Sequence, residues 1–307
     1  MRLIKPSFQI IKPTGYTIDD IYKSIELAGR VSYKSEDRIT EDSAKKFVDM
    51  LMKRKHYSPL EFGTVYLKVP ARKYRFLDND YFDECDDIKD SFYSNPYTKI
   101  HSQEGYHYIS TNYRVLLENF SKEFISELLQ YLCEPTEFHK KRYTVKFTCS
   151  RSISHEFVRH RTFSFMQESQ RYCNYYLEKF NSEITCIQPV WFTHDLTNES
   201  FINGNVGLLK NSPADGYTTN EEIFIRNLMY DEEWYMELLS NGLKPEEARE
   251  ILPNATKTEL FMCGTQSNWE HFLELRCAPN AHPQARELAI PLREEFIKNN
   301  FISNEEF

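Results

Sequence analysis

The residues best suited to chemistry lie in one short stretch, residues 159–172. It carries three arginines, a histidine, two serines, two glutamines and a glutamate. Arginine presents a rigid fork of N–H donors that matches the paired oxygens of a phosphate. Phe157, Val158, Phe163 and Phe165 interleave these charges with apolar groups, which favours a half-buried segment over a surface helix with solvated charges. Because a half-buried cation is costly without an anionic partner, the stretch predicts a site for an anionic ligand.

The composition excludes several classes of protein. With 46 acidic and 38 basic residues the net charge is −8, which argues against a partner that is a nucleic-acid polymer. No apolar run approaches membrane-spanning length, and the N-terminus lacks the apolar core of a signal peptide. The seven cysteines form no CxxC pair and no metal-ligand spacing. We therefore expect a soluble, cytoplasmic protein with reduced thiols, no metal and no membrane partner.

The elements that must position this stretch can be predicted from periodicity and end signals. Strands are expected over residues 2–12, 64–69, 143–149 and 184–192. Helices are expected over residues 17–33, 40–55, 113–132, 152–161, 219–240, 245–252, 269–276 and 283–299. Thr17 and Thr219 are candidate N-caps, and Pro245 suits the first turn of a helix. Residues 70–141 carry an apolar face of their own, which predicts an inserted helical subdomain.

Other candidate groups are weaker when taken alone. The predicted helix over residues 152–161 places Glu156 beside His160, because neighbours on a helix are three or four residues apart. Arg249 and Arg276 sit in apolar surroundings, where a structural ion pair is the commoner role for each. Cys173 could be a nucleophile, but a core thiol is the commoner case. No GxSxG, HExxH or glycine-rich phosphate loop is present, so side chains must hold any phosphate.

Five ordered motifs give the chain a specific resemblance. Arg159-His160-Arg161, seven residues and Ser169 resemble the signature of the flavin-dependent thymidylate synthases, the ThyX family. The motifs similar to other family elements are Arg30-Val31-Ser32, His56-Tyr57-Ser58-Pro59-Leu60-Glu61, Ala248-Arg249-Glu250-Ile251-Leu252-Pro253 and Phe272-Leu273-Glu274-Leu275-Arg276. They occur in the family's order and leave out residues 70–141 and the region near 200–216.

The resemblance implies an enzyme, a methyltransferase that converts dUMP to dTMP. Methylenetetrahydrofolate would donate the carbon and FAD, reduced by NADPH, would carry the hydride. It assigns catalysis to Arg276, which would meet the uracil, and to Ser169. The dUMP-binding residues that it implies are Glu156, Arg159, Gln167, Glu168, Ser169, Arg171, Arg249 and Arg276. The FAD-binding residues that it implies are Ser32, His56, Ser58, Arg159, His160, Arg161, Gln167, His271 and His282.

The resemblance also implies an α+β fold, an antiparallel sheet surrounded by helices. We expect one catalytic domain over residues 1–307, with residues 70–141 inserted in it, and a homotetramer. The sequence departs from the family pattern at Met166, where many members have Asn, and at Glu156, where many have Gln. His282 lies farther beyond Arg276 than the matching histidine of shorter members. The alternatives are a flavin- and folate-dependent enzyme for another pyrimidine nucleotide and a nucleotide-binding relative without catalysis.

Overall fold

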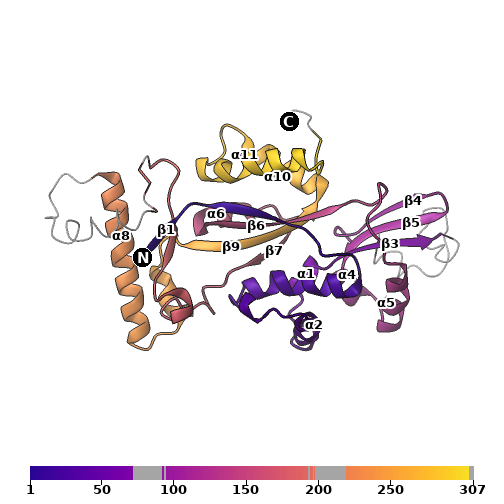
Figure 1. The fold of residues 1–307 in the computed structure, drawn as a ribbon, viewed down its shortest axis with the longest axis horizontal. Helices are drawn as coiled ribbons and strands as arrows, with labels where there is room; N and C mark the ends of the chain where they lie inside the picture. The colour runs from indigo at the N-terminus through magenta and orange to yellow at the C-terminus, as the bar shows by residue number, and fades with distance from the viewer. Residues whose placement is uncertain (72–91, 93–94, 193, 196, 198–218, 304–307) are drawn as a thin grey trace.

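A four-stranded antiparallel sheet forms the centre of the computed structural model (Figure 1). The described residues are 1–71, 92, 95–192, 194, 195, 197 and 219–303. The strand order is β2 (Ser7–Ile11), β6 (Arg142–Ser150), β9 (Lys257–Thr265) and β7 (Ser164–Gln167). The long strands β6 and β9 pair along their whole length, from Arg142 opposite Thr265 to Ser150 opposite Lys257. These two strands are the frame on which the motif of residues 159–172 is mounted.

Helices cover both faces of this sheet (Figure 1). On one face, α10 (Gln266–Cys277) and α11 (Pro283–Lys298) pack Trp269, Phe272 and Phe296 against Phe147 of β6. On the other face, α1 (Ile18–Val31) packs Ala28 and other apolar side chains against Phe261 of β9. Burial of large aromatic and aliphatic side chains contributes ~1.5–3 kcal/mol each, so these two layers hold the sheet rigidly in place.

A second sheet contains β3 (Thr64–Pro70), β5 (Tyr106–Asn112) and β4 (Lys99–Gln103). The helices α2 (Ser43–Lys53), α4 (Tyr113–Asn119) and α5 (Lys122–Leu128) share one apolar core with it and with α1. The inserted helical subdomain expected over residues 70–141 is therefore not confirmed. Its described part contains strands as well as helices, and it buries its apolar face against residues outside the range; residues 72–91, 93 and 94 lie outside the described residues.

Local sequence signals explain where several helices begin. Thr17 accepts a hydrogen bond from the backbone of Asp20, whose side chain accepts from the backbone of Thr17 in return. The same reciprocal cap joins Thr219 and Glu222 at the start of α8 (Asn220–Ser240). Pro245 occupies the first position of α9 (Pro245–Ala248), where its missing N–H removes no helical hydrogen bond. The three predicted helix starts are confirmed.

The predicted strand over residues 2–12 is two strands. The first, β1 (Arg2–Ile4), pairs in parallel with β8 (Thr185–Ile187), and the second is the edge strand β2 of the central sheet. The break falls at Lys5 and Pro6, since proline donates no ladder hydrogen bond. An α+β fold with antiparallel sheets is thus confirmed, with one parallel pair added. No helix of the described residues is long and apolar enough to cross a membrane.

The helix expected over residues 152–161 is shorter than predicted, and this matters for the motif. It is α6 (Arg151–Phe157), and Arg159, His160 and Arg161 follow its end. Residues after them enter β7, the edge strand that pairs with β9. The aromatic residues Phe163 and Phe165 suit a pleated surface, so pairing with β9 stabilises an extended chain there. The motif is therefore a helix end, a turn and a strand rather than one helix.

Candidate functional site

Arg276 joins two parts of the predicted site. It lies in the last turn of α10, and its Nη1 donates to Glu156 Oε2 at 2.6 Å. Its Nη2 donates to the backbone oxygen of Glu156 at 2.7 Å, and its Nε donates to His160 Nε2 at 3.0 Å. The predicted proximity of Glu156 and His160 is confirmed, but Arg276 brings the two together because α6 ends between them.

These contacts fix the protonation of His160. Because its Nε2 accepts from Arg276, the ring is neutral with its proton on Nδ1. Burial, together with the positive charge of Arg276 and the neighbouring His271, lowers the pKa of His160 to about 4. The His271 ring lies 6.2 Å from the His160 ring, and the His271 side chain is 64% exposed. Neutral pH therefore leaves His160 uncharged beside the Arg276 cation.

The last residue of β7, Gln167, and the next residue, Glu168, have different hydrogen-bond partners. Gln167 Nε2 donates to Ser154 Oγ at 2.8 Å and to Thr258 Oγ1 at 3.2 Å. The Glu168 carboxylate is 2% exposed and accepts hydrogen bonds from Tyr175 and Lys257. Both carboxylate oxygens therefore have partners inside the protein, so the carboxylate is not free to contact a ligand.

We call Arg151, Arg171 and Arg249 the arginine cluster: the charge of Arg249 acts on Arg151, and Arg171 pairs with Glu246 of the short helix that precedes Arg249. Arg171 Nε lies 3.4 Å from Glu246 Oε2 on α9, one turn before Arg249 in η6 (Arg249–Ile251). Arg151 Nη1 donates to the backbone oxygen of Glu168 at 3.3 Å and forms no carboxylate ion pair within the described chain. Burial lowers the pKa of Arg151, and the charge of Arg249 lowers it further. An anion beside Ser169 would relieve this repulsion.

A second concentration of positive charge surrounds a cavity of about 420 Å³ near the end of β9, which we call the cationic pocket. Its polar lining includes Tyr97, Lys99, Arg142, Arg161, Thr162, Thr265, Ser267 and Asn268. Among the described residues that line it there is no Asp or Glu. The buried Nε of Arg142 has no hydrogen-bond partner in the described structure, although its Nη2 donates to the backbone oxygen of Glu61. The pocket thus has basic side chains in its described lining and no carboxylate to pair with them.

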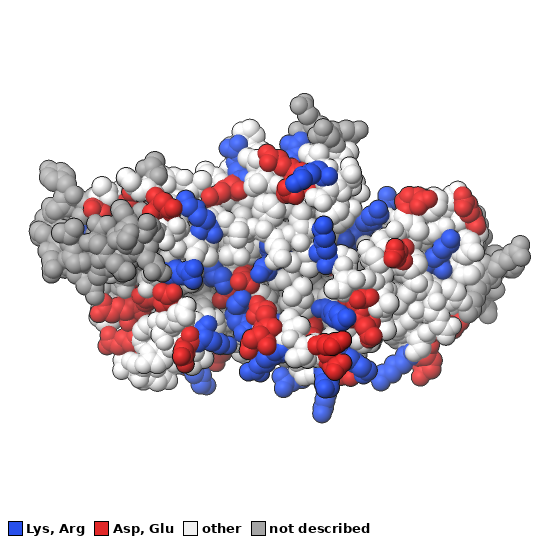
Figure 2. All heavy atoms as spheres, in the orientation of Figure 1, with Lys and Arg blue, Asp and Glu red and all other residues white. Residues whose placement is uncertain are grey.

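The charges elsewhere on the surface do not form such a concentration. Figure 2 shows Lys and Arg interspersed with Asp and Glu over the described residues of the face in view. A polyanion needs an extended basic surface, so the charges on this face do not favour one. The two basic sites are small, and their size suits a small anionic molecule.

The remaining predicted residues are distributed around these sites. Ser32 caps the end of α1, and its backbone oxygen accepts from Ser169 N at 3.2 Å, which brings the Arg-Val-Ser motif to the signature. His56 and Ser58 are exposed at the start of η2 (Ser58–Phe62), which lies beside β7. His282 caps α11, with its ring 6.0 Å from that of Trp191. No contact of His282 with the Arg276 site is found in the described structure.

Cys173 does not have the character of a nucleophile. It is fully buried, and burial raises the pKa of its thiol to about 12, so the thiolate is scarcely populated at neutral pH. This environment agrees with the prediction from the sequence that Cys173 is a thiol of the hydrophobic core.

Sequence reasoning missed Arg151, Lys99 and Arg142 as site residues. Arg151 opens α6 eight residues before the signature, so its separation in sequence gave no sign that it faces the same anion site. Arg142 and Lys99 begin strands in different sheets, and only their packing places them at one cavity. A cation at the first residue of a strand is too common a feature to have identified either one.

The described chain is an α+β protein with antiparallel sheets and two compact groups of basic side chains. The family model described as "Thymidylate synthase complementing protein" matches residues 94–299. The chain therefore belongs to the thymidylate synthase complementing protein family.

Curated relatives support this membership. The flavin-dependent thymidylate synthase of Synechocystis sp. is 30% identical over 162 residues, which cover 51% of this chain and 66% of that protein. The enzyme of the same name from Pyrococcus furiosus is 29% identical over 154 residues, 50% of this chain and 53% of that protein. A probable flavin-dependent thymidylate synthase of Paramecium bursaria Chlorella virus 1 is 29% identical over 159 residues, 50% of this chain and 66% of that protein. The matched segments thus span less than two thirds of these relatives.

Two solved structures align with the chain at low TM-scores. A UMP/dUMP methylase PolB from Streptomyces cacaoi bound with 5-Br UMP aligns over 97% of this chain and 92% of that one, with a TM-score of 0.41 and 16% identity. The same methylase bound with 5-Br dUMP gives a TM-score of 0.40 and 18% identity. Likeness at this level carries no weight for the fold or the substrate of this chain.

Proposed function

We propose that this protein is a flavin-dependent thymidylate synthase, which methylates dUMP to dTMP. Methylenetetrahydrofolate is the carbon donor, and NADPH supplies the reducing equivalents. The observation that carries the proposal is the arginine cluster beside Ser169, in a chain that belongs to this family. A nucleoside monophosphate is a compact dianion, which suits two or three converging guanidinium groups better than it suits an extended basic surface.

The chain's own residues then divide the work. Ser169, Arg171 and Arg249 bind the phosphate, and Arg151 adds a fourth donor group that the resemblance did not supply. Glu156, Arg159 and Gln167 line the nucleotide site. Arg276 meets the uracil and stabilises negative charge that develops on it, an effect that contributes ~3 kcal/mol for a well-placed donor. Neutral His160 holds Arg276 in orientation without competing for the nucleotide's negative charge.

The cationic pocket supports FAD as the cofactor. A dinucleotide flavin carries a diphosphate, and the pocket offers three cations, hydroxyl and amide groups and no carboxylate in its described lining. Arg142 and Arg161 would hold the diphosphate. Arg159, His160, His271, Ser32, His56, Ser58, Gln167 and His282 are the other proposed FAD contacts. When bound, the flavin supplies hydride transfer, which no side chain of the protein can provide.

The proposal extends to assembly and location as the family resemblance implies them. The protein is a homotetramer of single catalytic domains over residues 1–307, with residues 70–141 as an insertion in each, and it is cytoplasmic. Sedimentation of the purified protein tests the oligomeric state. A monomer that nevertheless converts dUMP would contradict this part of the proposal alone.

The decisive experiment is rescue of a thymidine-requiring bacterium that lacks its own synthase. Growth without thymidine on the wild-type gene, and not on Arg276→Ala, is the expected result. In a product assay, Arg171→Ala should raise the dUMP requirement about tenfold or more while bound flavin stays unchanged. Loss of flavin with unchanged dUMP affinity would contradict the assigned role of Arg171.

Glu156 is the reason to test a second nucleotide. Its carboxylate accepts from Arg276 at 2.6 Å, where an amide would offer a donor as well. A carboxylate accepts equally well from the N3–H of uracil and from the amino group of cytosine. Turnover of dCMP without turnover of dUMP would replace the proposed substrate. A protein that binds no flavin and turns over neither nucleotide would indicate a relative without catalysis.

A further inference from the structure

A group of alternating charges, half-buried except for the fully buried Glu168, lies around the residue that follows β7 and has no part in the proposed function. We call it the ion network; its members are Lys34, Glu36, Lys146, Glu168, Lys257 and Glu259. We propose that Glu168 is a positioning residue, which through Lys257 and Tyr175 holds the backbone of residues 167–169 so that Ser169 faces the nucleotide phosphate. The inference rests on the proposed function, because it concerns the same substrate site.

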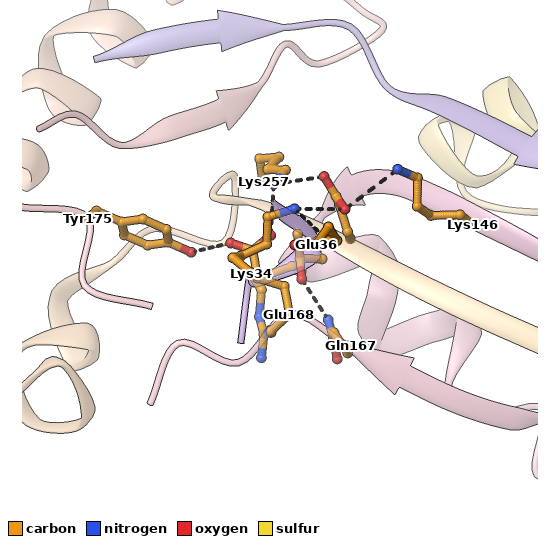
Figure 3. A network of polar contacts seen from close by, with 10 residues as sticks. Lys34, Glu36, Lys146, Gln167, Glu168, Tyr175 and Lys257 are labelled. Atoms are coloured by element: carbon orange, nitrogen blue, oxygen red, sulfur yellow. Dashed lines mark hydrogen bonds and ion pairs between the residues drawn. The ribbon is translucent and has the colours of Figure 1, made fainter. Parts of the chain in front are cut away.

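The carboxylate of Glu168 is held from two sides (Figure 3). Tyr175 Oη donates to Oε1 at 3.0 Å, and Lys257 Nζ donates to Oε2 at 2.8 Å. The side chain of Glu168 is 1% exposed and that of Lys257 is 16% exposed. A charge-assisted hydrogen bond shielded from water is strong and directional, so it restricts both position and orientation of the carboxylate.

The rest of the network compensates the charge of Lys257. Glu259 lies 3.3 Å from Lys257, 3.0 Å from Lys34 and 3.7 Å from Lys146. Although burial opposes ionisation, these surrounding lysines lower the pKa of Glu259 to about 2. Three lysines thus meet three glutamates, and no charge of the network is left over for a ligand. This balance indicates a role in holding the protein chain.

The backbone around Glu168 transmits that hold to the site. Glu168 N donates to the backbone oxygen of Glu259 at 2.9 Å, and Ser169 N donates to that of Ser32 at 3.2 Å. Successive side chains of an extended segment point to opposite sides. Anchoring the carboxylate on the inner side therefore directs Gln167 and Ser169 to the other side, where Gln167 already meets Ser154.

The test separates positioning from stability with the variants Glu168→Leu, Lys257→Met and their double combination. Lys257→Met leaves the buried Glu168 carboxylate without its cation, and Glu168→Leu leaves Lys257 with Glu259 as its one remaining carboxylate, so each should lower the Tm. The double variant removes both charges and should recover most of the Tm, because Glu259 keeps Lys34 and Lys146. If Glu168 positions the site, the Kd of the double variant for dUMP should stay about tenfold higher than that of the wild type, as measured by calorimetry on the flavin-loaded protein.

Recovery of both the Tm and the dUMP affinity in the double variant would overturn the inference, since Glu168 would then be structural only. Unchanged dUMP affinity in Glu168→Leu would overturn it as well. Lys45→Met is the matched control, because Lys45 forms an exposed ion pair with Asp49 far from the network, and it should change neither quantity. Wild-type protein that fails to bind dUMP would overturn the proposed function together with this inference, whereas equal binding by wild type and variants overturns the inference alone.

Discussion

The cationic pocket and the ion network differ in one respect that decides their roles. Both contain three basic side chains close to the central sheet. In the network each lysine has a glutamate within 3.7 Å, whereas the described lining of the pocket has no carboxylate. The network therefore satisfies itself inside the protein, and the pocket leaves its positive charge for something outside the chain.

This difference shows how basic residues can be sorted in a structure. Buried charges that are paired and hydrogen-bonded maintain geometry, and their loss is felt as instability. Cations without an internal partner cost the folded protein free energy that an anionic ligand returns on binding. The same residue types thus give a stability phenotype at one place and a binding phenotype at the other.

The largest effect should come from Glu259→Leu. This change leaves the lysines of the network facing one another with fewer anions, so we expect a loss of ~3 kcal/mol in the free energy of unfolding, measured in urea. Flavin affinity per folded molecule should not change. A variant as stable as wild type would show that the network does not compensate these charges.

A smaller effect, in binding instead of stability, is expected for Arg161→Ala. Arg161 is exposed and forms no ion pair within the described residues, so the urea midpoint should stay the same. Loss of one charge-assisted contact to the flavin diphosphate should weaken flavin binding by ~2 kcal/mol, about thirtyfold, as followed by flavin fluorescence. Arg38→Ala is the matched control, because Arg38 is also exposed. An equal loss of flavin affinity in the two variants would contradict the assignment of the cationic pocket as the flavin site.

Acid should separate the Arg276 site, which contains His160, from the ion network by the pH at which each loses stability. The pKa of His160 is about 4 in the folded protein and ordinarily 6.5, so the unfolded chain binds the proton first. Its contribution is complete above pH 6.5 and is lost as the pH falls toward 4, with a slope of up to ~1.4 kcal/mol per pH unit. Glu259, with a pKa of about 2 against an ordinary 4.5, contributes fully above pH 4.5 and loses this only below it. In urea unfolding measured at a series of pH values, His160→Asn should remove pH dependence of the free energy of unfolding only between pH 4 and 6.5. Loss of the pH dependence in that range by Glu259→Leu would contradict the assignment.

The smallest effect is expected for Lys45→Met. This change removes a lysine–carboxylate ion pair on an exposed helix face. Its partner Asp49 is 49% exposed, and water screens the pair, so the change in the free energy of unfolding should be below ~0.5 kcal/mol. A loss as large as that of Glu259→Leu would show that burial does not distinguish the network from a surface pair.

The sequence by itself determined three helix starts and the strands β3 and β6, and it made residues 159–172 the candidate site. Thr17, Thr219 and Pro245 act through hydrogen bonds within a few residues, which is why their roles could be predicted from the sequence. The five motifs likewise indicated the family that the later comparison established. The predicted end of α6 at residue 161 was wrong, because pairing of β7 with the distant strand β9 decides where the helix stops.

Only the tertiary structure decided which charges have partners. Glu168 and Ser169 are adjacent in the sequence, but the first is neutralised by Lys257 and Tyr175 and the second lies beside the arginine cluster. Arg151, Arg142 and Lys99 became site residues only through packing of separate elements. The physical reason is that an ion pair depends on distance in space and on burial, and neither is encoded by the spacing of charges along the chain.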